Sequence, residues 1–270
     1  MDPEHKRTVF ILSVSSDIGM NLMDKYLSEG ANVIGTYRNK QFFQNFKKNP
    51  NVKLLEVDLE NSNHLHRASN YFSENNIKWD LLILSNGTME PIGPFMDLDD
   101  DKWETSIISN AIMPCRILKS LFPFRSKKQI PSVCFFAGGG TNGTFTNYSS
   151  YCLSKIFLIK MCELLDDEVS DIKTFILGPG YTKTKIHNET INAKNKAGKN
   201  LEKTLNFFDT EGTSMDDIYD SIEWCVKNSK KSIGGRNFSI VHDNWKDTTD
   251  NLISRLENDN NLYKLRRLGN

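Results

Sequence analysis

The sequence predicts an α/β protein built on a doubly wound parallel sheet of about seven strands, with helices on both faces of the sheet. Two observations support this prediction. Strand-like and helix-like segments alternate along the whole chain, and the strand-like segments are nearly continuous apolar runs. Such strands are typical of a sheet whose two faces are both buried. The chain has 270 residues without an internal repeat or linker, so we expect a single domain over residues 1–270.

Seven segments are apolar and rich in β-branched residues, as buried strands are. They are Thr8–Val14, Asn32–Tyr37, Val52–Val57, Asp80–Ser85, Ser132–Ala137, Lys173–Leu177 and Asn237–Val241. Apolar residues at helical spacing predict helices over Gly19–Glu29, Lys102–Phe122 and Tyr148–Leu165, and helical stretches also precede the third and fourth strands. Each strand is therefore expected to connect to the next through a helix that packs on the sheet.

One segment breaks this alternation. Residues 182–214 are polar, rich in Lys and Asn, and only weakly periodic. A long irregular insertion in a compact domain is often a binding loop, so we expect a substrate lid here, with a solvated surface loop as the alternative. Six lysines against four acidic residues favour an anionic substrate such as a nucleotide-linked sugar, although a solvated charged loop also explains them. His187 has no visible partner in the sequence and is left unassigned.

The composition argues against several classes of function. The 34 basic and 34 acidic residues give a net charge of zero, so nothing favours bulk attraction to nucleic acid or an anionic membrane. No apolar run approaches the ~20 residues that span a bilayer, and Met1–Arg7 is no apolar signal segment. The five cysteines lack C-x-x-C and zinc-like spacings, so we expect reduced, buried thiols and no metal site. A soluble, cytoplasmic protein is expected.

The first predicted strand leads through a tight turn into a helix, an arrangement that binds phosphate groups. Free N–H groups and the helix dipole face an anion at such a helix N-terminus. The usual turn has three glycines, whereas this one retains only Gly19. We expect the turn to bind the phosphates of a dinucleotide through Ser13, Ser15, Ser16, Ile18 and Gly19.

The end of the second strand indicates which dinucleotide is bound. In a doubly wound fold this strand end faces the adenosine ribose, where a carboxylate selects NAD and repels a 2′-phosphate. The sequence has Tyr37 and then Arg38, whose guanidinium can hold a phosphate in a fork. We therefore predict NADP(H) in preference to NAD(H).

Two further strand ends supply candidate cofactor contacts. Asp58 and Leu59 follow the third strand, where the Asp58 carboxylate is placed to accept a hydrogen bond from the adenine amino group. Asn86 and Gly87 follow the fourth strand, where a small turn lets the backbone approach the cofactor. Their place in the strand order carries this prediction, since both short sequences are common.

Tyr151 and Lys155 lie one turn apart on the helix predicted over Tyr148–Leu165. A free tyrosine has a pKa near 10, so it exchanges protons readily near neutrality only if its pKa falls by roughly three units. A nearby lysine and a positively charged nicotinamide ring can together supply that drop. Tyr181 and Lys185 have the same spacing but lie in the loop after the sixth strand, so position in the fold selects Tyr151.

In its ordered series of motifs, the chain resembles the short-chain dehydrogenase/reductase family, which has a Rossmann-type fold, over nearly its whole length. The matching elements are the turn at Ser15–Gly19, Asp58-Leu59, Asn86-Gly87, Asn110, Tyr151 with Lys155, Pro179-Gly180 and Thr184. The resemblance implies that Tyr151 is the general acid/base and that Lys155 holds the nicotinamide ribose and lowers the tyrosine pKa. It implies that Asn110 supports a water linking the lysine to solvent. Pro179, Gly180, Thr182 and Thr184 are expected to position the nicotinamide.

The sequence departs from the family at one catalytic position. The family has a serine at the end of the fifth strand, which polarises the substrate carbonyl. Counting back from Tyr151 gives Gly138, and aligning the glycine run gives Ala137, so neither alignment supplies a hydroxyl. Loss of one such donor costs on the order of 100- to 1,000-fold in rate. Thr141 is a candidate replacement; otherwise the substrate supplies a polarising group, or the protein is a slow or inactive relative.

The leading function is an NADP(H)-dependent oxidoreductase that interconverts a carbonyl and an alcohol, on a sugar or nucleotide-sugar. The alternatives are a cofactor-retaining sugar epimerase or dehydratase and a catalytically lapsed NADP(H)-binding module. The stretch from Gly234 to Arg267 is similar to a branch of the family associated with bacterial surface-polysaccharide pathways. Family members commonly pair through their two long helices, so the resemblance implies a homodimer or homotetramer.

Overall fold

The computed structural model describes residues 6–38, 49–61, 64–247 and 251–267, and it contains the predicted parallel sheet. The strands are β1 (Thr8–Leu12), β2 (Asn32–Tyr37), β3 (Val52–Glu56), β4 (Leu81–Leu84), β5 (Ser132–Phe136), β6 (Lys173–Gly178) and β7 (Arg236–Ser239). Every neighbouring pair is parallel, in the order β3-β2-β1-β4-β5-β6-β7. The fold class and the seven strands are thus confirmed, with strand ends that differ from the prediction by one or two residues.

The order of the strands reverses at β1, which creates the binding crevice of this fold. From β1 the chain passes to β2 and β3 on one side and then places β4 on the other side of β1. The loops that leave the carboxyl ends of β1 and β4 therefore diverge. Leu12 and Leu84 pair at the ends of these two strands, so two of the predicted cofactor segments begin side by side.

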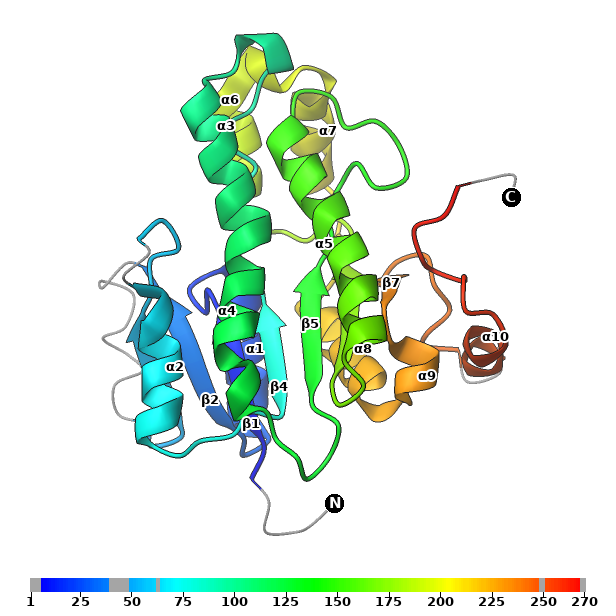
Figure 1. Cartoon of the computed structure of the whole chain (residues 1–270). Coiled ribbons are helices and arrows are strands. Elements are labelled where there is room, and N and C mark those ends of the chain that lie inside the picture. The colour runs from blue at the N-terminus through cyan, green and yellow to red at the C-terminus, as the bar shows by residue number, and fades with distance from the viewer. Residues whose placement is uncertain (1–5, 39–48, 62–63, 248–250, 268–270) are drawn as a thin grey trace.

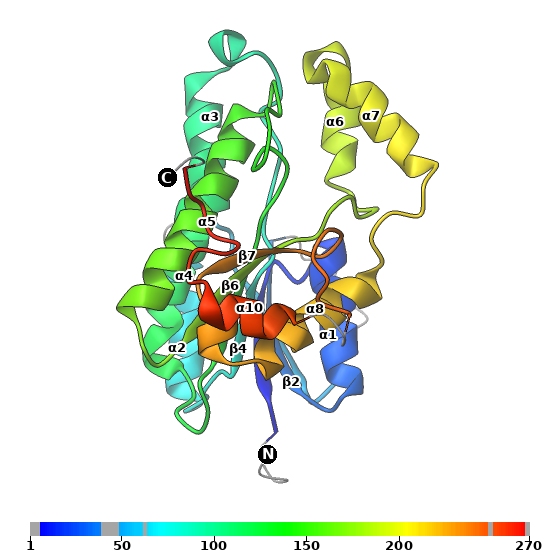
Figure 2. The same cartoon turned by 90° about the vertical axis from the view of Figure 1, so that its right-hand side faces the viewer.

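Helices cover both faces of the sheet, and Figures 1 and 2 show the three layers. On one face lie α1 (Asp17–Ser28) and α8 (Met215–Lys227), with the shorter α9 (Lys230–Ile233) and α10 (Leu252–Asn258) packed against the same apolar cluster. On the other face lie α2 (Leu65–Glu74), α4 (Met113–Leu121) and α5 (Ser149–Glu168). Along β1, Val9 and Ile11 enter the first cluster, whereas Phe10 and Leu12 enter the second. All four side chains are fully buried, as the apolar pattern predicts.

The helix predicted over Lys102–Phe122 is not one regular helix. It consists of α3 (Asp100–Ile107), a π-helical turn η4 (Ile108–Ile112) and α4, and it is followed by the 3-10 turn η5 (Phe122–Phe124). Asn110 lies in the π-helical turn and is fully buried. Turns of this kind are frequent at functional sites because the extra residue redirects nearby side chains.

The prediction of an irregular conformation for residues 182–214 is wrong. The segment forms α6 (His187–Ala193), a 3-10 turn η6 (Lys194–Ala197) and α7 (Lys199–Phe208). In Figure 2 these helices stand above the carboxyl ends of the strands. Only a few of their side chains are buried, among them Thr190, Ala197 and Phe207, and two of the three buried side chains of α7, Asn200 and Thr204, are polar.

Smaller features complete the description. A 3-10 turn η3 (Phe95–Asp97) precedes α3. All five cysteines are free thiols, of which three are buried while Cys115 and Cys152 are half-buried. None of the helices in the described part of the chain is both long and apolar enough to cross a membrane.

Candidate active site

A cleft of about 2000 Å³ opens at the carboxyl ends of the strands, and residues of α6 and α7, the helices of the predicted lid, line one side of it. It brings together nearly all of the predicted site residues. The cleft is lined by Ser13, Ser15, Ser16, Ile18, Arg38, Asp58, Leu59, Asn86, Gly87, Tyr151, Lys155, Pro179, Gly180, Thr182 and Thr184. The two remaining predicted residues, Gly19 and Asn110, lie behind this lining.

Side chains close the turn between β1 and α1 where the usual turn has glycines. The Ser16 hydroxyl accepts a hydrogen bond from the Gly19 N–H at 3.0 Å and caps α1. Ser13 has a positive φ of 61°, and its N–H donates to the Thr36 hydroxyl at 2.9 Å. A Cβ at Gly19 would lie 2.6 Å from the Ser13 carbonyl oxygen, so this position accepts only glycine. The N-terminus of α1 therefore faces the cleft as an anion site.

Arg38 lies beside the cleft at the end of β2, with 72% of its side chain exposed. Its guanidinium lies 3.6 Å from the Glu60 carboxylate. An exposed ion pair of this kind contributes little free energy and is easily exchanged for another partner. Asp58 accepts the Glu60 N–H at 3.1 Å, which orders the loop after β3 beside Arg38. The guanidinium is therefore accessible to a ligand phosphate at this end of the cleft.

At the end of the cleft away from Arg38, two buried oxygens accept no hydrogen bond from the described residues. Asn86 donates its side-chain amide to the Ser109 carbonyl at 2.8 Å, but its Oδ1 has no partner, and the Thr182 hydroxyl has none either. Buried polar atoms of this kind require a ligand or water. A Cβ at Gly87 would lie 3.8 Å from the Lys155 ammonium, so glycine keeps the approach to the lysine open. These features fit the polar carboxamide and ribose of a nicotinamide nucleotide.

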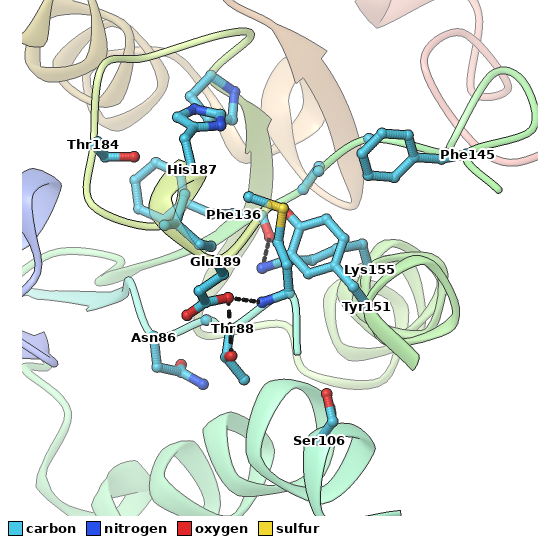
Figure 3. A pocket seen from close by; sticks show the side chains of 18 of the residues that line it. Asn86, Thr88, Ser106, Phe136, Phe145, Tyr151, Lys155, Thr184, His187 and Glu189 are labelled. Carbon is cyan, nitrogen blue, oxygen red and sulfur yellow. Dashed lines mark hydrogen bonds between the residues drawn. The ribbon is translucent and has the colours of Figure 1, made fainter. Parts of the chain in front are cut away.

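Tyr151 and Lys155 extend from α5 into the cleft (Figure 3). The Lys155 ammonium lies 5.5 Å from the centre of the Tyr151 ring and donates to the Phe136 carbonyl at 3.0 Å. Burial lowers the pKa of Lys155 to about 8. Burial raises the pKa of Tyr151, with smaller contributions from Cys152 and the Glu189 carboxylate. Desolvation thus acts against the lowered pKa that the resemblance implies; that lowering also depends on a bound nicotinamide and stays a prediction.

Asn110 supports the site through the backbone. Its Oδ1 accepts the Thr88 N–H, and its amide donates to the Thr88 carbonyl, both at 2.9 Å. The same amide also lies 3.2 Å from the Ser106 hydroxyl. Both ends of the side chain thus fix the segment that follows Gly87. The link from Asn110 through water to the lysine stays a prediction.

Gly138, rather than Ala137, occupies the position that faces the reacting hydroxyl. A Cβ at Gly138 would lie 2.2 Å from the Tyr151 hydroxyl oxygen, so the tyrosine fills the space that a side chain would take. The Thr141 hydroxyl donates to the Gly138 carbonyl at 3.0 Å. Because that proton closes the loop, the structure argues against Thr141 as the donor to a substrate carbonyl.

The loop after β6 has a shape that requires glycine. Gly180 has a φ of 71°, and a Cβ there would lie 2.6 Å from a methyl carbon of Val241. The Thr184 hydroxyl donates to the Thr182 carbonyl at 3.3 Å, which orders the start of the lid. Both threonines line the cleft, in agreement with the prediction that they contact the cofactor, although that contact stays a prediction.

The second Tyr–Lys pair has a different environment. The Tyr181 ring stacks on His187 with 5.9 Å between ring centres, and burial lowers the pKa of His187. The Lys185 N–H donates to the Asp17 carboxylate at 2.6 Å, and its ammonium lies 3.3 Å from the same group. Asp17, which the sequence did not single out, thus ties the lid to the first turn of α1.

Glu189 is a second cleft residue that sequence reasoning missed. Its carboxylate accepts the Met89 N–H at 2.5 Å and the Thr88 hydroxyl at 3.1 Å, as Figure 3 shows. Burial raises the pKa of Glu189. In the sequence it was only one acidic residue of a charged lid, and its one distinguishing signal was its place in a segment expected to cover the substrate.

The sequence and fold match known proteins. The family model described as short chain dehydrogenase matches residues 7–195. An uncharacterized oxidoreductase of Schizosaccharomyces pombe is 26% identical over 195 residues, which are 68% of this chain and 77% of that protein. The structure of a short chain dehydrogenase/reductase from Saccharomyces cerevisiae has a TM-score of 0.77 at 17% identity and covers 93% of this chain and 99% of its own. 4-Hydroxyisoleucine dehydrogenase complexed with NADH has a TM-score of 0.72 at 22% identity, covering 87% and 96%.

The family model covers more than half of the chain, so the protein belongs to the short-chain dehydrogenase family. It is an oxidoreductase of that class, which uses an NAD(P)-type nucleotide and acts on small molecules. The structural neighbours share its fold.

Proposed function

We propose that the protein is an NADP(H)-dependent oxidoreductase that interconverts a carbonyl and an alcohol. The observation that carries this proposal is the position of Tyr151 and Lys155 in a cleft beside the unpaired oxygens of Asn86 and Thr182. A bound nicotinamide supplies or accepts the hydride. This chain's own residues must then bind both partners and transfer a proton.

We expect Tyr151 to transfer the proton in the proposed reaction. Its pKa is raised, so the phenol holds its proton and can donate it to a carbonyl oxygen as the carbon accepts the hydride. The reverse reaction returns the proton to the phenolate. Lys155 stabilises that phenolate through its charge, and Asn110 holds the backbone at Thr88 that forms one wall of the site.

The preference for NADP(H) is supported by Arg38. The guanidinium lies at the end of β2, is mostly exposed, and among the described residues has only the weak contact to Glu60 to give up. A 2′-phosphate therefore has an accessible partner.

A sugar or nucleotide-sugar substrate is supported by the lid. Lys194 and Lys196 line the cleft and offer positive charge to a phosphate group. Glu189 lines the same cleft and offers an acceptor to hydroxyl groups. The combination of lysines and a carboxylate suits a molecule that carries both phosphates and hydroxyls.

The test combines binding and turnover. We expect NADPH to bind more tightly than NADH, and NADPH to be consumed with at least one member of a panel of ketones, aldehydes and nucleotide-sugars. Tighter binding of NADH would contradict the cofactor assignment. Cofactor that survives purification without net turnover would favour an epimerase or dehydratase, and binding without any turnover would favour a lapsed cofactor-binding module.

We also propose that the protein forms a homodimer or homotetramer through α5. Leu153, Phe157 and Leu164 lie on this helix and are 40–51% exposed, and Ile108 on the adjacent η4 is 45% exposed. Apolar side chains that line one helix face favour burial against a second copy. Light scattering should show an oligomer that the double substitution Leu153→Lys with Phe157→Lys converts to monomers; a monomeric wild-type protein would contradict the proposal.

A further inference from the structure

Glu189 is held rigidly in the cleft by its helix. The next residue, Thr190, is buried, and its hydroxyl accepts a hydrogen bond from the Tyr148 hydroxyl at 2.9 Å. Tyr148 itself immediately precedes α5 and is fully buried. This contact fixes α6 against the start of the helix that carries Tyr151. The Glu189 side chain therefore has a defined place relative to the acid/base.

The two carboxylate oxygens of Glu189 have different surroundings. Oε2 accepts both the Met89 N–H at 2.5 Å and the Thr88 hydroxyl at 3.1 Å. Both of these hydrogen bonds go to Oε2, and the Glu90 N–H also stabilises the charge of the carboxylate. Within the described parts of the chain, no lysine or arginine forms an ion pair with the group. One oxygen thus anchors the side chain, while the other is available to a molecule in the cleft (Figure 3).

The environment of Glu189 favours a ligand that donates a hydrogen bond. The half-buried carboxylate faces the cleft, and a donor from a ligand can take the place of the water that solvates its oxygen there. Glu189 and Tyr151 line the same cleft, where Figure 3 shows both side chains, so a ligand that contacts the Glu189 carboxylate shares the cleft with the acid/base. An ether or carboxylate group there would instead be repelled.

We infer that Glu189 determines substrate specificity by accepting, at Oε1, a hydrogen bond from a hydroxyl group beside the carbonyl that Tyr151 protonates. This inference rests on the proposed carbonyl–alcohol chemistry and deepens it. It favours hydroxyketones and sugars over simple ketones. Glu189 acts here by positioning the substrate and transfers no proton.

The test uses three ketones of equal size with NADPH as the reductant. In 1-hydroxy-2-butanone the neighbouring group donates a hydrogen bond, in methoxyacetone it only accepts, and in 3-pentanone it does neither. For the wild-type protein we expect kcat/KM to be highest for the hydroxyketone, by about tenfold over 3-pentanone, because one hydrogen bond to a charged group is worth about that factor. Methoxyacetone should be the poorest substrate.

Two substitutions probe the residue directly. Glu189→Leu removes the acceptor and should bring the hydroxyketone to 3-pentanone ratio close to one. In Glu189→Gln the single amide oxygen must accept the Met89 N–H, so the amide N–H group turns toward the cleft. This reversal should raise the kcat/KM for methoxyacetone above the kcat/KM for 3-pentanone. The control Thr190→Val removes the hydrogen bond to Tyr148 that holds α6 in place. It should change kcat/KM for all three ketones by the same factor.

The outcomes separate this inference from the proposed function. A wild-type ratio near one, or a Glu189→Leu variant that slows all three ketones equally as Thr190→Val does, would overturn the role of Glu189 and leave the oxidoreductase proposal standing. A wild-type protein that binds NADPH but reduces no carbonyl of any panel would overturn both.

Discussion

Two ends of the cleft differ in how they replace residues that are usual in this fold. The phosphate end is the turn between β1 and α1, where the cofactor phosphates are expected, and the chemical end is the region of Tyr151 and Gly138, where the reaction is expected. At the phosphate end, Ser13 and Ser16 close a glycine-poor turn through hydrogen bonds to Thr36 and Gly19. At the chemical end, Gly138 supplies no hydroxyl. The nearby Thr141 hydroxyl is used by the loop itself. At the phosphate end, neighbouring residues therefore compensate for the missing glycines. At the chemical end, Thr141 does not replace the missing serine hydroxyl.

The difference has a physical reason. A phosphate site needs backbone N–H groups at a helix N-terminus, and many side chains can hold the backbone in that shape. Stabilising a reacting carbonyl needs one donor at one point in space, and a displacement of about 1 Å weakens it severely. Divergence is therefore tolerated more easily in the turn after β1 than in the loop after β5.

The largest effect is expected from Tyr151→Phe at the chemical end. The substitution removes the proton donor and should lower kcat by about 100- to 10,000-fold. Because the ring remains, NADPH binding should be nearly unchanged. Steady-state kinetics and NADPH titration measure the two quantities. Turnover that survives the substitution would show that another group supplies the proton and would remove the contrast between the two ends.

At the phosphate end, Arg38→Ala should weaken NADPH binding by about 10- to 100-fold and leave NADH binding nearly unchanged. A hydrogen-bonded contact to a charged group contributes about 1.5–3 kcal/mol, or roughly one to two factors of ten. Isothermal titration with both cofactors measures the effect. The matched control Glu60→Ala removes the weak partner of Arg38 and should not weaken NADPH binding. Equal losses for both cofactors would mean that Arg38 does not select the 2′-phosphate.

Restoring the missing hydroxyl tests whether the chemical end is limited by its absence. Both Gly138→Ser and Gly138→Ala add a Cβ that must displace the Tyr151 hydroxyl, but only serine adds a donor. We expect kcat/KM of the serine variant to exceed that of the alanine variant by about tenfold, below the full value of an ideally placed donor. Equal activities would show that the substrate already carries its own polarising group.

The smallest effect is a pH dependence from Lys155. Burial lowers its pKa to about 8, so the ammonium is lost as pH rises through that value. The kcat/KM for NADPH, which reports on the free enzyme, should fall to about half of its neutral value near pH 8 and fall further above it.

The stability of the protein should change in the opposite direction. The unfolded lysine keeps its proton to about pH 10.4, so between about pH 8 and that value the unfolded state binds more protons. The contribution of Lys155 to the free energy of unfolding therefore rises with pH across this window. Urea titrations of the wild-type protein and of Lys155→Met measure it. A difference between the two that does not change with pH would contradict the lowered pKa.

Much of the fold was predictable because the central strands carry a nearly continuous apolar signal. Phe10 and Leu12 alternate with Val9 and Ile11, and both sets are apolar, which indicates a sheet buried on both sides. Residues 182–214 were predictable as a polar segment that interrupts the alternation but not as helices, because the buried side chains of α6 and α7 include the polar Thr190, Asn200 and Thr204. The π-helical turn at Asn110 left no sequence signal.

By itself, the sequence determined which segments form strands, which family the chain belongs to, and that Tyr151 and Lys155 are the reactive pair. These properties depend on residue type and on order along the chain. Tertiary structure alone decided that Gly138 faces the tyrosine, that burial raises the pKa of that tyrosine, and that Glu189 enters the cleft. Those properties depend on distances between segments far apart in the chain and on exclusion of water, and neither is encoded in local spacing.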